Sequence, residues 1–456
     1  MNTGKNEKVI IVGGGLSGPV MAMYLAQKGY NVDVYEQRAD MRKQKISAGR
    51  SINLALSKRG IRALEEVGVF NQISPFLIPM YGRRIHDANG STRSLPYGRK
   101  GQHINSVSRS ELNKILISEA EHTGKVRFFF NHTCTGVDIK SDIIYFIENQ
   151  SEKQINIRQI PVIATDGAGS TIRKSMSSQK FILEVLEPLG HGYKELTVPP
   201  DKTGDFQLEP NSLHIWPRGQ FMLIALPNMD RSFTVTLFLP NKGEVSFESI
   251  KTNSELVSLF KEKFPDVLSL IPDLTHDYFS NPTGHLGTVR CQPWNIKNFL
   301  LIGDAAHAVV PFFGQGMNAS FEDCTVLNEM MEMMEMYGDW ENLFDNFSKK
   351  RKIDGDAIAD MALENYIEMR DLVNQQWFLV QKELENKMEH QFPGQFISRY
   401  SMVSFHQIPY SVVQKRGETQ KKIMEWILEN ETSGKPITSE ALEKEINLKL
   451  PVLNQS

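Results

Sequence analysis

The first part of the chain alternates apolar runs with longer segments of helical periodicity. Val9–Val12 is an uninterrupted apolar run, and a glycine-rich turn and an amphipathic stretch over Pro19–Lys28 follow it. A second run, Val32–Glu36, alternates apolar and polar residues, so the three segments predict a strand, a helix and a strand. Further strands are predicted over Val126–Phe130 and Pro161–Gly167. Strands that alternate with helices favour a parallel, Rossmann-like sheet.

The pattern of apolar and polar residues changes near Gly190. Four apolar, β-rich segments follow in close succession, HGYKELTVP, LHIWP, FMLIALP and FTVTLFLP, with turn residues between them. This pattern predicts an antiparallel sheet. The first pattern returns at Asn298–Asp304, and a charged helical pattern runs from Trp340 to Glu389. The β-rich lobe is therefore predicted to be an insertion in the chain of the first lobe. Ligand-binding pockets often lie at the junction between two such lobes.

Composition narrows the class of protein. The chain has 456 residues, of which 40% are hydrophobic and 23% are charged, as in soluble globular proteins with more than one lobe. A net charge of −3 gives no reason to expect nucleic acid as a partner. No run approaches the roughly 20 apolar residues of a membrane helix, and the first residues lack the apolar core of a signal peptide. We therefore expect a soluble protein without a membrane anchor.

Cysteine and methionine usage argues against a disulfide or metal site. Cys134, Cys291 and Cys324 are odd in number and far apart, which is typical of a reducing cytoplasm. The run Met330–Met336 resembles a soft-metal site, but a helix face that packs into the core is the simpler interpretation. We expect no metal and a cytoplasmic location.

The glycine turn after the first strand carries the strongest chemical signal. Gly13, Gly15 and Gly18 have the G-x-G-x-x-G spacing between a strand and a helix. Such glycines allow a tight bend, a close approach of the backbone to a pyrophosphate, and close helix packing. Glu36 ends the next strand, where a carboxylate accepts hydrogen bonds from ribose hydroxyls and repels a 2′-phosphate. The motif favours FAD or NAD over NADP as a tightly held dinucleotide, and the alternative is a glycine turn without a ligand.

Two further strand–turn–helix corners follow the same plan. Asp166 and Gly167 end a predicted strand just before a helix that starts near Ser170. Asp304 ends another strand, and its turn leads into a helix from about Met317. A carboxylate and a helix N-terminus can together hold ribose or ribityl hydroxyls and a polar ring edge. Taken alone, each corner is also compatible with an ordinary capped helix start.

The order of the three corners resembles the FAD-dependent aromatic hydroxylases of the para-hydroxybenzoate hydroxylase type. The chain has only one G-x-G-x-x-G motif for binding a dinucleotide. The resemblance therefore implies that the nicotinamide cofactor binds transiently and has no binding domain of its own. The charged C-terminal tail differs from the hydrophobic membrane anchor of eukaryotic members, and we expect a soluble bacterial form. Six long segments narrow the resemblance to the kynurenine 3-monooxygenases: Arg50–Gly60, Ser106–Asn113, Leu213–Arg218, Ala225–Phe233, Asp304–Asn318 and Glu364–Arg370.

The resemblance implies an α/β fold with a Rossmann-like FAD-binding domain, an inserted antiparallel β-sheet substrate domain and a C-terminal helical segment. We expect the FAD-binding domain in residues 1–185 and 291–340, and the substrate domain in residues 186–290. The helical segment is expected in residues 341–456.

The implied reaction is the hydroxylation of L-kynurenine to 3-hydroxykynurenine in tryptophan catabolism, with tightly bound FAD, NADPH as a transient co-substrate, and O₂. It would proceed through a flavin C4a-hydroperoxide, which needs orientation and a dry cavity rather than a covalent nucleophile or an acid–base residue. We therefore expect no catalytic triad, and His307 is predicted to be a structural corner residue.

Kynurenine carries an amino-acid group, a ketone and an aniline ring, and the resemblance implies contacts to each. Arg83 is expected to bind the carboxylate bidentately beside Tyr97, while Arg84 is assigned to the surface or the flavin side. Phe312 is expected to wall the ring, and Gln315 to reach the ketone or the aniline. Other residues, which would otherwise be taken as core or helix-face positions, complete the predicted set: Asn365, Tyr400, Leu213, Met222, Ile224, Leu226, Phe238 and Met369.

The flavin contacts implied by the resemblance extend beyond the three corners. Met317 and Asn318 are expected to hold the isoalloxazine edge from a helix N-terminus, and Leu16 and Cys134 to lie near the adenosine. The full predicted set is Gly13, Gly15, Leu16, Gly18, Glu36, Ala55, Arg109, Cys134, Asp166, Asp304, Met317 and Asn318.

Two other functions remain open on the sequence. One is a flavin monooxygenase for another anionic aromatic substrate, such as a benzoate or an anthranilate. The other is a binding protein that keeps the fold without redox chemistry, as the Rab GDP-dissociation inhibitors do. Turnover with kynurenine tests the first alternative and flavin uptake tests the second. The sequence indicates no oligomeric state.

Overall fold

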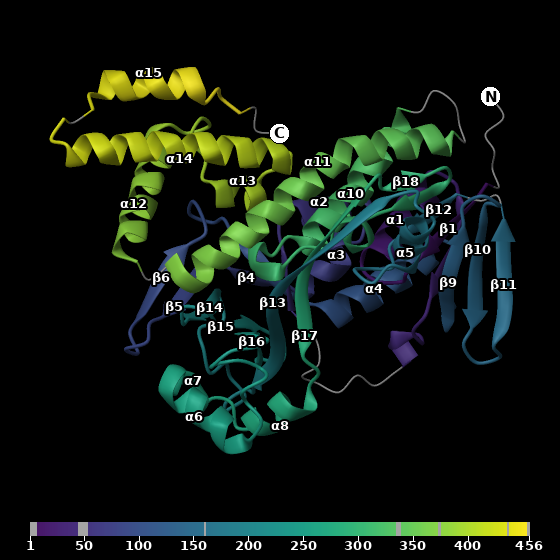
Figure 1. Ribbon diagram of the computed structural model, residues 1–456, viewed down its shortest axis with the longest axis horizontal. Coiled ribbons are helices and arrows are strands. Elements are labelled where there is room, and N and C mark those ends of the chain that lie inside the picture. Colours follow the sequence, from purple (N-terminus) through teal and green to yellow (C-terminus); the bar gives the residue numbers. More distant parts are fainter. Residues whose placement is uncertain are drawn as a thin grey trace.

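The computed structural model describes residues 7–43, 53–158, 161–333, 339–372, 375–435 and 437–453. The start of the segment Arg50–Gly60 and the end of the methionine run Met330–Met336 lie outside these ranges. Two large sheets, two small sheets, the helices around them and a C-terminal group of helices make up the described part of the molecule (Figure 1).

A six-stranded sheet forms the centre of the first half, with the order β18-β19-β12-β1-β2-β8. All neighbouring strands are parallel except β18 and β19. Its strands are mostly buried apolar runs, as expected for a parallel sheet covered by other elements. The predicted β-α-β unit and parallel sheet are confirmed. The strands are β1 (Lys8–Val12), β2 (Asn31–Glu36), β8 (Val126–Phe130), β12 (Val162–Ala164), β18 (Asn295–Ile296) and β19 (Phe299–Leu301).

Helices and two small sheets surround this core. Helix α1 packs between β1 and the helices α4 and α10, and α2 packs on α10. The helices are α1 (Ser17–Gln27), α2 (Lys58–Glu66), α3 (Phe70–Ile73), α4 (Arg109–His122), α5 (Thr171–Ser178), α9 (Asp304–His307) and α10 (Gly316–Glu332), with short turns η1 (Met41–Lys43), η2 (Ser74–Phe76) and η3 (Pro311–Phe313). The small sheets are β3-β7-β4 (Asn53–Leu56, Ile104–Ser108, Ile78–Met80) and β11-β10-β9 (Lys153–Arg158, Ile143–Glu148, His132–Asp138).

A seven-stranded sheet forms the second half, with the order β17-β13-β16-β15-β14-β5-β6. The strands of the inserted lobe pair in antiparallel fashion, as predicted. Strands β5 and β6 come from the first predicted domain segment, and β5 joins β14 in parallel. The strands are β5 (Gly82–His86), β6 (Thr92–Pro96), β13 (Leu183–Val198), β14 (Ser212–Pro217), β15 (Met222–Pro227), β16 (Phe233–Pro240) and β17 (Gly284–Gln292).

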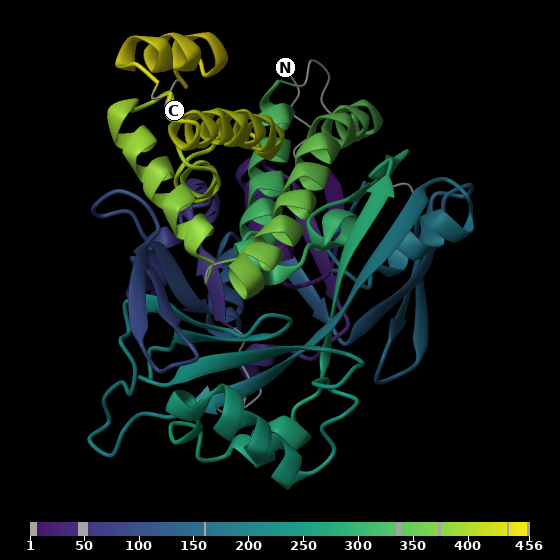
Figure 2. The same ribbon diagram turned by 60° about the vertical axis from the view of Figure 1, so that its left-hand side comes forward.

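The two faces of this large sheet have different partners. Alternate residues such as Trp216, Leu223 and Leu237 pack against the helices α6 (Asn253–Lys263), α7 (Pro265–Leu268) and α8 (Leu274–Ser280). The residues between them, such as Met222 and Phe238, pack on the other side against η3 and the C-terminal helices. Figure 2 shows α6–α8 on one side of the sheet and the C-terminal helices, in yellow-green and yellow, on the other.

The C-terminal segment is helical, as predicted, and its first helix, α11, is also its longest. In Figure 1, α11 crosses the molecule from the six-stranded sheet towards the large sheet. In the described ranges, no helix is both long enough and apolar enough to cross a membrane. The elements are α11 (Trp340–Ile367), η4 (Glu368–Leu372), α12 (Gln376–Gln391), α13 (Arg399–Phe405), α14 (Tyr410–Thr432) and α15 (Ser439–Lys449).

Candidate functional site

The three predicted cofactor corners meet at one edge of the six-stranded sheet. Strands β1, β12 and β19 are neighbours and parallel, so their carboxyl ends lie side by side. The Thr165 hydroxyl donates to the Gly13 carbonyl over 2.9 Å, which joins the first corner to the second. A Cβ atom on Gly13 would lie 2.5 Å from the Thr165 oxygen, and the φ angle of Gly13 is 107°. Only glycine fits there.

Two helix N-termini point at this edge with free backbone donors. Neither α1 nor α10 has a side-chain cap within the described residues, and the first turns of both lack acidic residues. A Cβ atom on Gly18 would lie 2.1 Å from the Gly13 oxygen, so glycine lets α1 start tightly against its own turn. Uncapped helix N-termini bind anions and polar ring edges. Met317 and Asn318 lie in the first turn of α10. Their contact with the flavin edge stays a prediction.

Glu36 is buried behind the glycine turn. Its carboxylate accepts hydrogen bonds from the Gly14 N–H over 2.7 Å and from the Arg38 side chain over 2.7 Å. Burial opposes ionisation of Glu36, but these donors outweigh it and lower its pKa. A carboxylate has about four acceptor positions, so ionised Glu36 keeps capacity for the hydroxyls of a ribose.

The carboxylates of the other two corners differ from Glu36. Oδ2 of Asp166 accepts the N–H of Thr171 over 2.8 Å, whereas its buried Oδ1 has no hydrogen-bond partner in the described ranges. The structure likewise shows no hydrogen bond to the half-buried Asp304 side chain from any described residue. Burial raises the pKa of both groups, even though the charges of His307 and Arg109 oppose this at Asp304. Hydroxyl donors of a bound ligand would satisfy both carboxylates.

The remaining predicted cofactor residues lie around these corners. The side chain of Asn318 binds the protein itself, because it donates to the Ala55 and Gly314 oxygens over 2.8 Å each and accepts the Ser57 N–H. Only the backbone of Asn318 therefore remains available for the predicted flavin contact. Arg109 is exposed at the start of α4, and Leu16 is buried at the start of α1. Burial raises the pKa of Cys134, on β9, to about 12, and the charge of Asp166 adds to this.

Arg83 and Arg84 project from opposite faces of β5. Arg83 pairs with Leu213, on the face that meets η3, whereas Arg84 pairs with His214, on the face that meets α6–α8. The guanidinium of Arg83 lies 4.8 Å from the Tyr400 ring centre. Its Nη1 lies 3.5 Å from the Glu368 carboxylate, and its buried Nε has no hydrogen-bond partner among the described residues.

Aromatic rings extend from this arginine towards α10. Tyr97 stacks on Tyr400 with ring centres 4.8 Å apart, and Tyr400 stacks on Phe313 at 5.6 Å. Phe312, the predicted ring wall, instead stacks on Tyr366 at 4.0 Å and lies 5.0 Å from Phe238. Sequence reasoning missed Phe313, because nothing in the neighbouring pair Phe312–Phe313 indicates which side each ring takes in a short turn.

The predicted apolar slot lies on the inner face of the large sheet. Met222, Phe238 and Met369 belong to one buried cluster, and Leu226 belongs to a neighbouring cluster with Tyr97. Leu213, Ile224 and Tyr400 pack against both clusters, and Ala55 packs against the second. The structure therefore brings the predicted apolar residues together next to Ala55, a predicted flavin contact.

Two predicted polar contacts are engaged by the protein itself. The Asn365 amide donates to the Phe312 carbonyl over 2.6 Å and so holds η3. The buried Gln315 accepts the Tyr410 hydroxyl over 2.9 Å. Sequence reasoning missed Tyr410, which starts α14, and also Glu368, although Glu368 follows Asn365 by one helical turn. Their roles towards ligands remain predictions.

Comparisons with known sequences identify the family of this chain. Residues 6–362 match the family model described as an FAD binding domain. The kynurenine 3-monooxygenase of Myxococcus xanthus is 46% identical over 422 residues, which cover 91% of this chain and 90% of the relative. The kynurenine 3-monooxygenase of Dictyostelium discoideum is 42% identical over 434 residues, which cover 92% of each chain.

Solved structures agree on the fold. The tetrameric form of 2-methyl-3-hydroxypyridine-5-carboxylic acid oxygenase has a TM-score of 0.66 at 18% identity, over 81% of this chain and 94% of that chain. The tetracycline destructase Tet(55) has a TM-score of 0.61 at 15% identity, over 87% of this chain and 100% of that chain. The sequence relatives are far more similar and span nearly the whole chain. The chain therefore belongs to the kynurenine 3-monooxygenase family of FAD-dependent monooxygenases.

Proposed function

We propose that this FAD-dependent monooxygenase uses NADPH and O₂ to hydroxylate L-kynurenine to 3-hydroxykynurenine. One observation carries the proposal: the buried anion anchor Arg83 lies at one end of an aromatic, apolar face whose other end meets the N-terminus of α10. An amino-acid carboxylate at the anchor would direct an attached aromatic ring towards that helix.

The features of the sheet edge fit FAD. Gly13 and Gly18 leave room for a close backbone approach, and the N-terminus of α1 offers N–H groups to a pyrophosphate. Asp166 and Asp304 carry acceptor oxygens without a protein donor among the described residues, and Glu36 stays ionised for the ribose. When bound, FAD supplies the electron transfer from NADPH and the activation of O₂.

The amino-acid group of the substrate would bind between Arg83, Tyr97, Tyr400 and Glu368. The Arg83 fork matches a carboxylate in geometry and charge. Burial raises the pKa of both tyrosines, so their hydroxyls stay protonated and can donate. Lys382 and Arg83 lower the pKa of Glu368 against the effect of burial, so its ionised carboxylate can accept the substrate ammonium. This arrangement pairs each substrate charge with an opposite charge.

Water exclusion follows from the packing above the site. The apolar residues of the large sheet, η3, α11, α13 and α14 form one buried cluster. A substrate ring bound against this cluster would be shielded from water and held in one orientation. We also propose a cytoplasmic location, which the three buried, unpaired cysteines support.

The rate of NADPH oxidation tests the proposal. Protein saturated with FAD should oxidise NADPH slowly alone and much faster with L-kynurenine, whereas benzoate and anthranilate should give little stimulation. Stimulation by benzoate or anthranilate but not by kynurenine would replace the proposed substrate with another anionic aromatic. A protein that takes up no FAD would contradict the redox function itself.

A further inference from the structure

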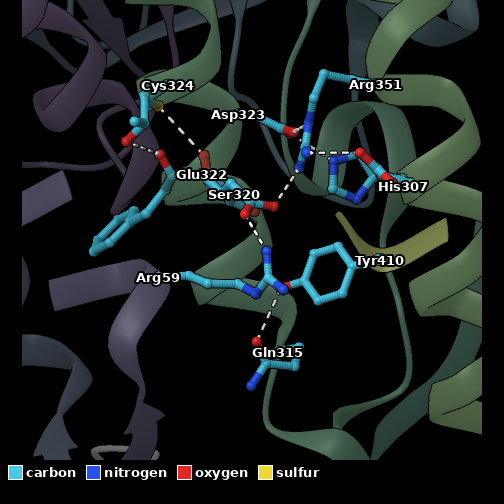
Figure 3. Close-up of polar contacts among 12 residues, drawn as sticks. Arg59, His307, Gln315, Ser320, Glu322, Asp323, Cys324, Arg351 and Tyr410 are labelled. Atoms are coloured by element: carbon cyan, nitrogen blue, oxygen red, sulfur yellow. Dashed lines mark hydrogen bonds and ion pairs between the residues drawn. The ribbon is translucent and has the colours of Figure 1, made fainter. Parts of the chain in front are cut away.

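A buried cluster of charged residues lies directly behind the Asp304 corner. Asp323 on α10 has no exposed surface, and Arg351 on α11 is almost as buried. Figure 3 shows Arg351 and His307 close to Asp323, and the Arg59 side chain beside the Tyr410 ring. Removing these charged groups from water costs free energy unless each has a partner of opposite charge or a hydrogen bond. Apolar packing alone therefore does not explain why they are buried here.

The Asp323 carboxylate spans the corner and α11. Its Oδ2 accepts the backbone N–H of Gly303 over 3.0 Å and lies 2.6 Å from Nε2 of His307. Its Oδ1 accepts Nε of Arg351 over 2.8 Å. Burial disfavours the ionised form, but His307 and Arg351 outweigh it and keep the Asp323 pKa low. The carboxylate is therefore a charged acceptor with three donors around it.

The backbone that Asp323 holds is an unusual one. Gly303 has a φ angle of 61°, and a Cβ atom there would lie 2.6 Å from the Ser320 hydroxyl. The same residue accepts the N–H of His307 over 2.8 Å and immediately precedes Asp304. The direction of the Asp304 carboxylate therefore depends on the backbone that Asp323 fixes.

We propose that Asp323 is a positioning residue for FAD, which holds the Gly303 backbone so that the Asp304 carboxylate faces the cofactor hydroxyls. Asp323 acts through Gly303 and His307 and makes no contact with FAD itself. The proposal rests on the proposed role of Asp304, so Asp304→Asn is the reference variant. It is independent of which aromatic substrate is hydroxylated.

Asp354 provides a matched control. Its carboxylate also binds Arg351, over 3.2 Å, and accepts the Ser411 N–H, but within the described ranges it forms no hydrogen bond or ion pair with the Gly303 corner. Asp323→Asn and Asp354→Asn each remove one buried negative charge from Arg351. A difference between the two variants in FAD affinity therefore reports on the corner rather than on the loss of charge.

The test is a titration of flavin-free protein with FAD, followed by flavin fluorescence, with the thermal midpoint of each flavin-free variant measured in parallel. We expect Asp323→Asn to raise the Kd for FAD about tenfold or more, and Asp304→Asn to do the same, since a hydrogen bond to a charged group contributes about one to two powers of ten. Asp354→Asn should leave the Kd near that of the wild type while it lowers the thermal midpoint comparably. The visible absorption bands of bound flavin should shift in Asp323→Asn and in Asp304→Asn, and should stay at the wild-type position in Asp354→Asn.

Each other outcome overturns a defined part of the proposal. A wild-type Kd in Asp323→Asn, or an equal rise in Asp354→Asn, would show that Asp323 has no positioning role. A wild-type Kd in Asp304→Asn would overturn the proposed role of Asp304, and the inference with it. If Asp323→Asn fails to fold, Asp323→Glu replaces it, because it keeps the charge but displaces the acceptor by one methylene, and the same outcomes apply.

Discussion

Arg83 is the residue whose removal should damage substrate binding most. The change Arg83→Ala should raise the KM for kynurenine about 10²-fold, because a charge-assisted bidentate pair contributes roughly 3 kcal/mol. The content of bound FAD should stay at the wild-type level, since Arg83 lies on the large sheet and away from the three corners. Steady-state kinetics and the ratio of flavin to protein absorbance check both expectations.

Arg84→Ala is the control, because it removes the same charge from the opposite face of β5. It should leave the KM unchanged. An equal rise of KM in both variants would mean that overall charge, rather than the position of Arg83, determines the effect.

Glu36 should give the protein a specific dependence on pH. Its pKa is lowered in the folded state, so its stabilising effect is complete above the ordinary pKa of about 4.3 and disappears as the pH falls through the folded-state value. Near pH 7, Glu36→Gln should therefore cost about 2 kcal/mol of stability. The difference in thermal midpoint between wild type and variant should shrink towards zero in acid. A difference that is constant with pH would contradict this account.

Single residues were predicted from the sequence with uneven success. The spacing of the glycines in the first turn predicts that they are needed for close backbone contacts. The structure shows such contacts at Gly13 and Gly18. Successive side chains of a strand point to opposite faces of the sheet, so Arg83 and Arg84 must lie on different faces. The pairing of β5 with β14 then shows which face each one takes. The ring directions in η3 follow from its contacts with α11 and α13, and no local pattern encodes those contacts.

Among the elements, α2 and the C-terminal helices are joined through one buried side chain. Arg59 on α2 donates to the carbonyls of Val403 and Ile408 and forms an ion pair with Glu322, and its guanidinium lies 4.0 Å from the Tyr410 ring centre. Arg59→Met should weaken the attachment of α13 and α14 by about 1–3 kcal/mol, because it leaves the Val403 and Ile408 carbonyls without this donor. Glu322 keeps its ion pair with Arg351. Amide hydrogen exchange in these helices should accelerate while exchange in β1 and β12 stays slow.

Arg62 on the same helix is the matched control. It forms ion pairs with Glu66 and Glu329 near the surface and donates one hydrogen bond to the Gln407 side chain, between α13 and α14. Surface ion pairs contribute about 0–1 kcal/mol. Arg62→Met should therefore accelerate exchange in α13 and α14 much less than Arg59→Met does. Uniform acceleration across all elements in Arg59→Met would show that the residue stabilises the whole fold rather than this attachment.

Elements were easier to predict than their partners. The alternation over Val9–Val12, Pro19–Lys28 and Val32–Glu36 predicts the β-α-β unit, and the structure confirms it. The sequence pattern offers no sign that β5 and β6 leave the first lobe and extend the large sheet, because strand pairing over such a separation depends on tertiary contacts. The domain boundary at residue 185 stays a prediction, and β5 and β6 belong to the large sheet although they precede it in the chain.

At the scale of the whole molecule, the two sheets and the C-terminal helices have complementary tasks. The edge of the six-stranded sheet gathers three corners suited to FAD, and the inner face of the large sheet supplies an apolar wall with one arginine. Helices α11, α13 and α14 close the apolar side. An aromatic amino acid can then be held by its charged end while its ring meets the cofactor.

Product analysis tests this central claim most directly. The FAD-loaded protein is incubated with L-kynurenine, NADPH and isotopically labelled O₂, and the product is identified by mass and by comparison with authentic 3-hydroxykynurenine. We predict 3-hydroxykynurenine that carries one oxygen atom from O₂. Unchanged kynurenine after NADPH has been consumed, or a product without labelled oxygen, would contradict the proposed function.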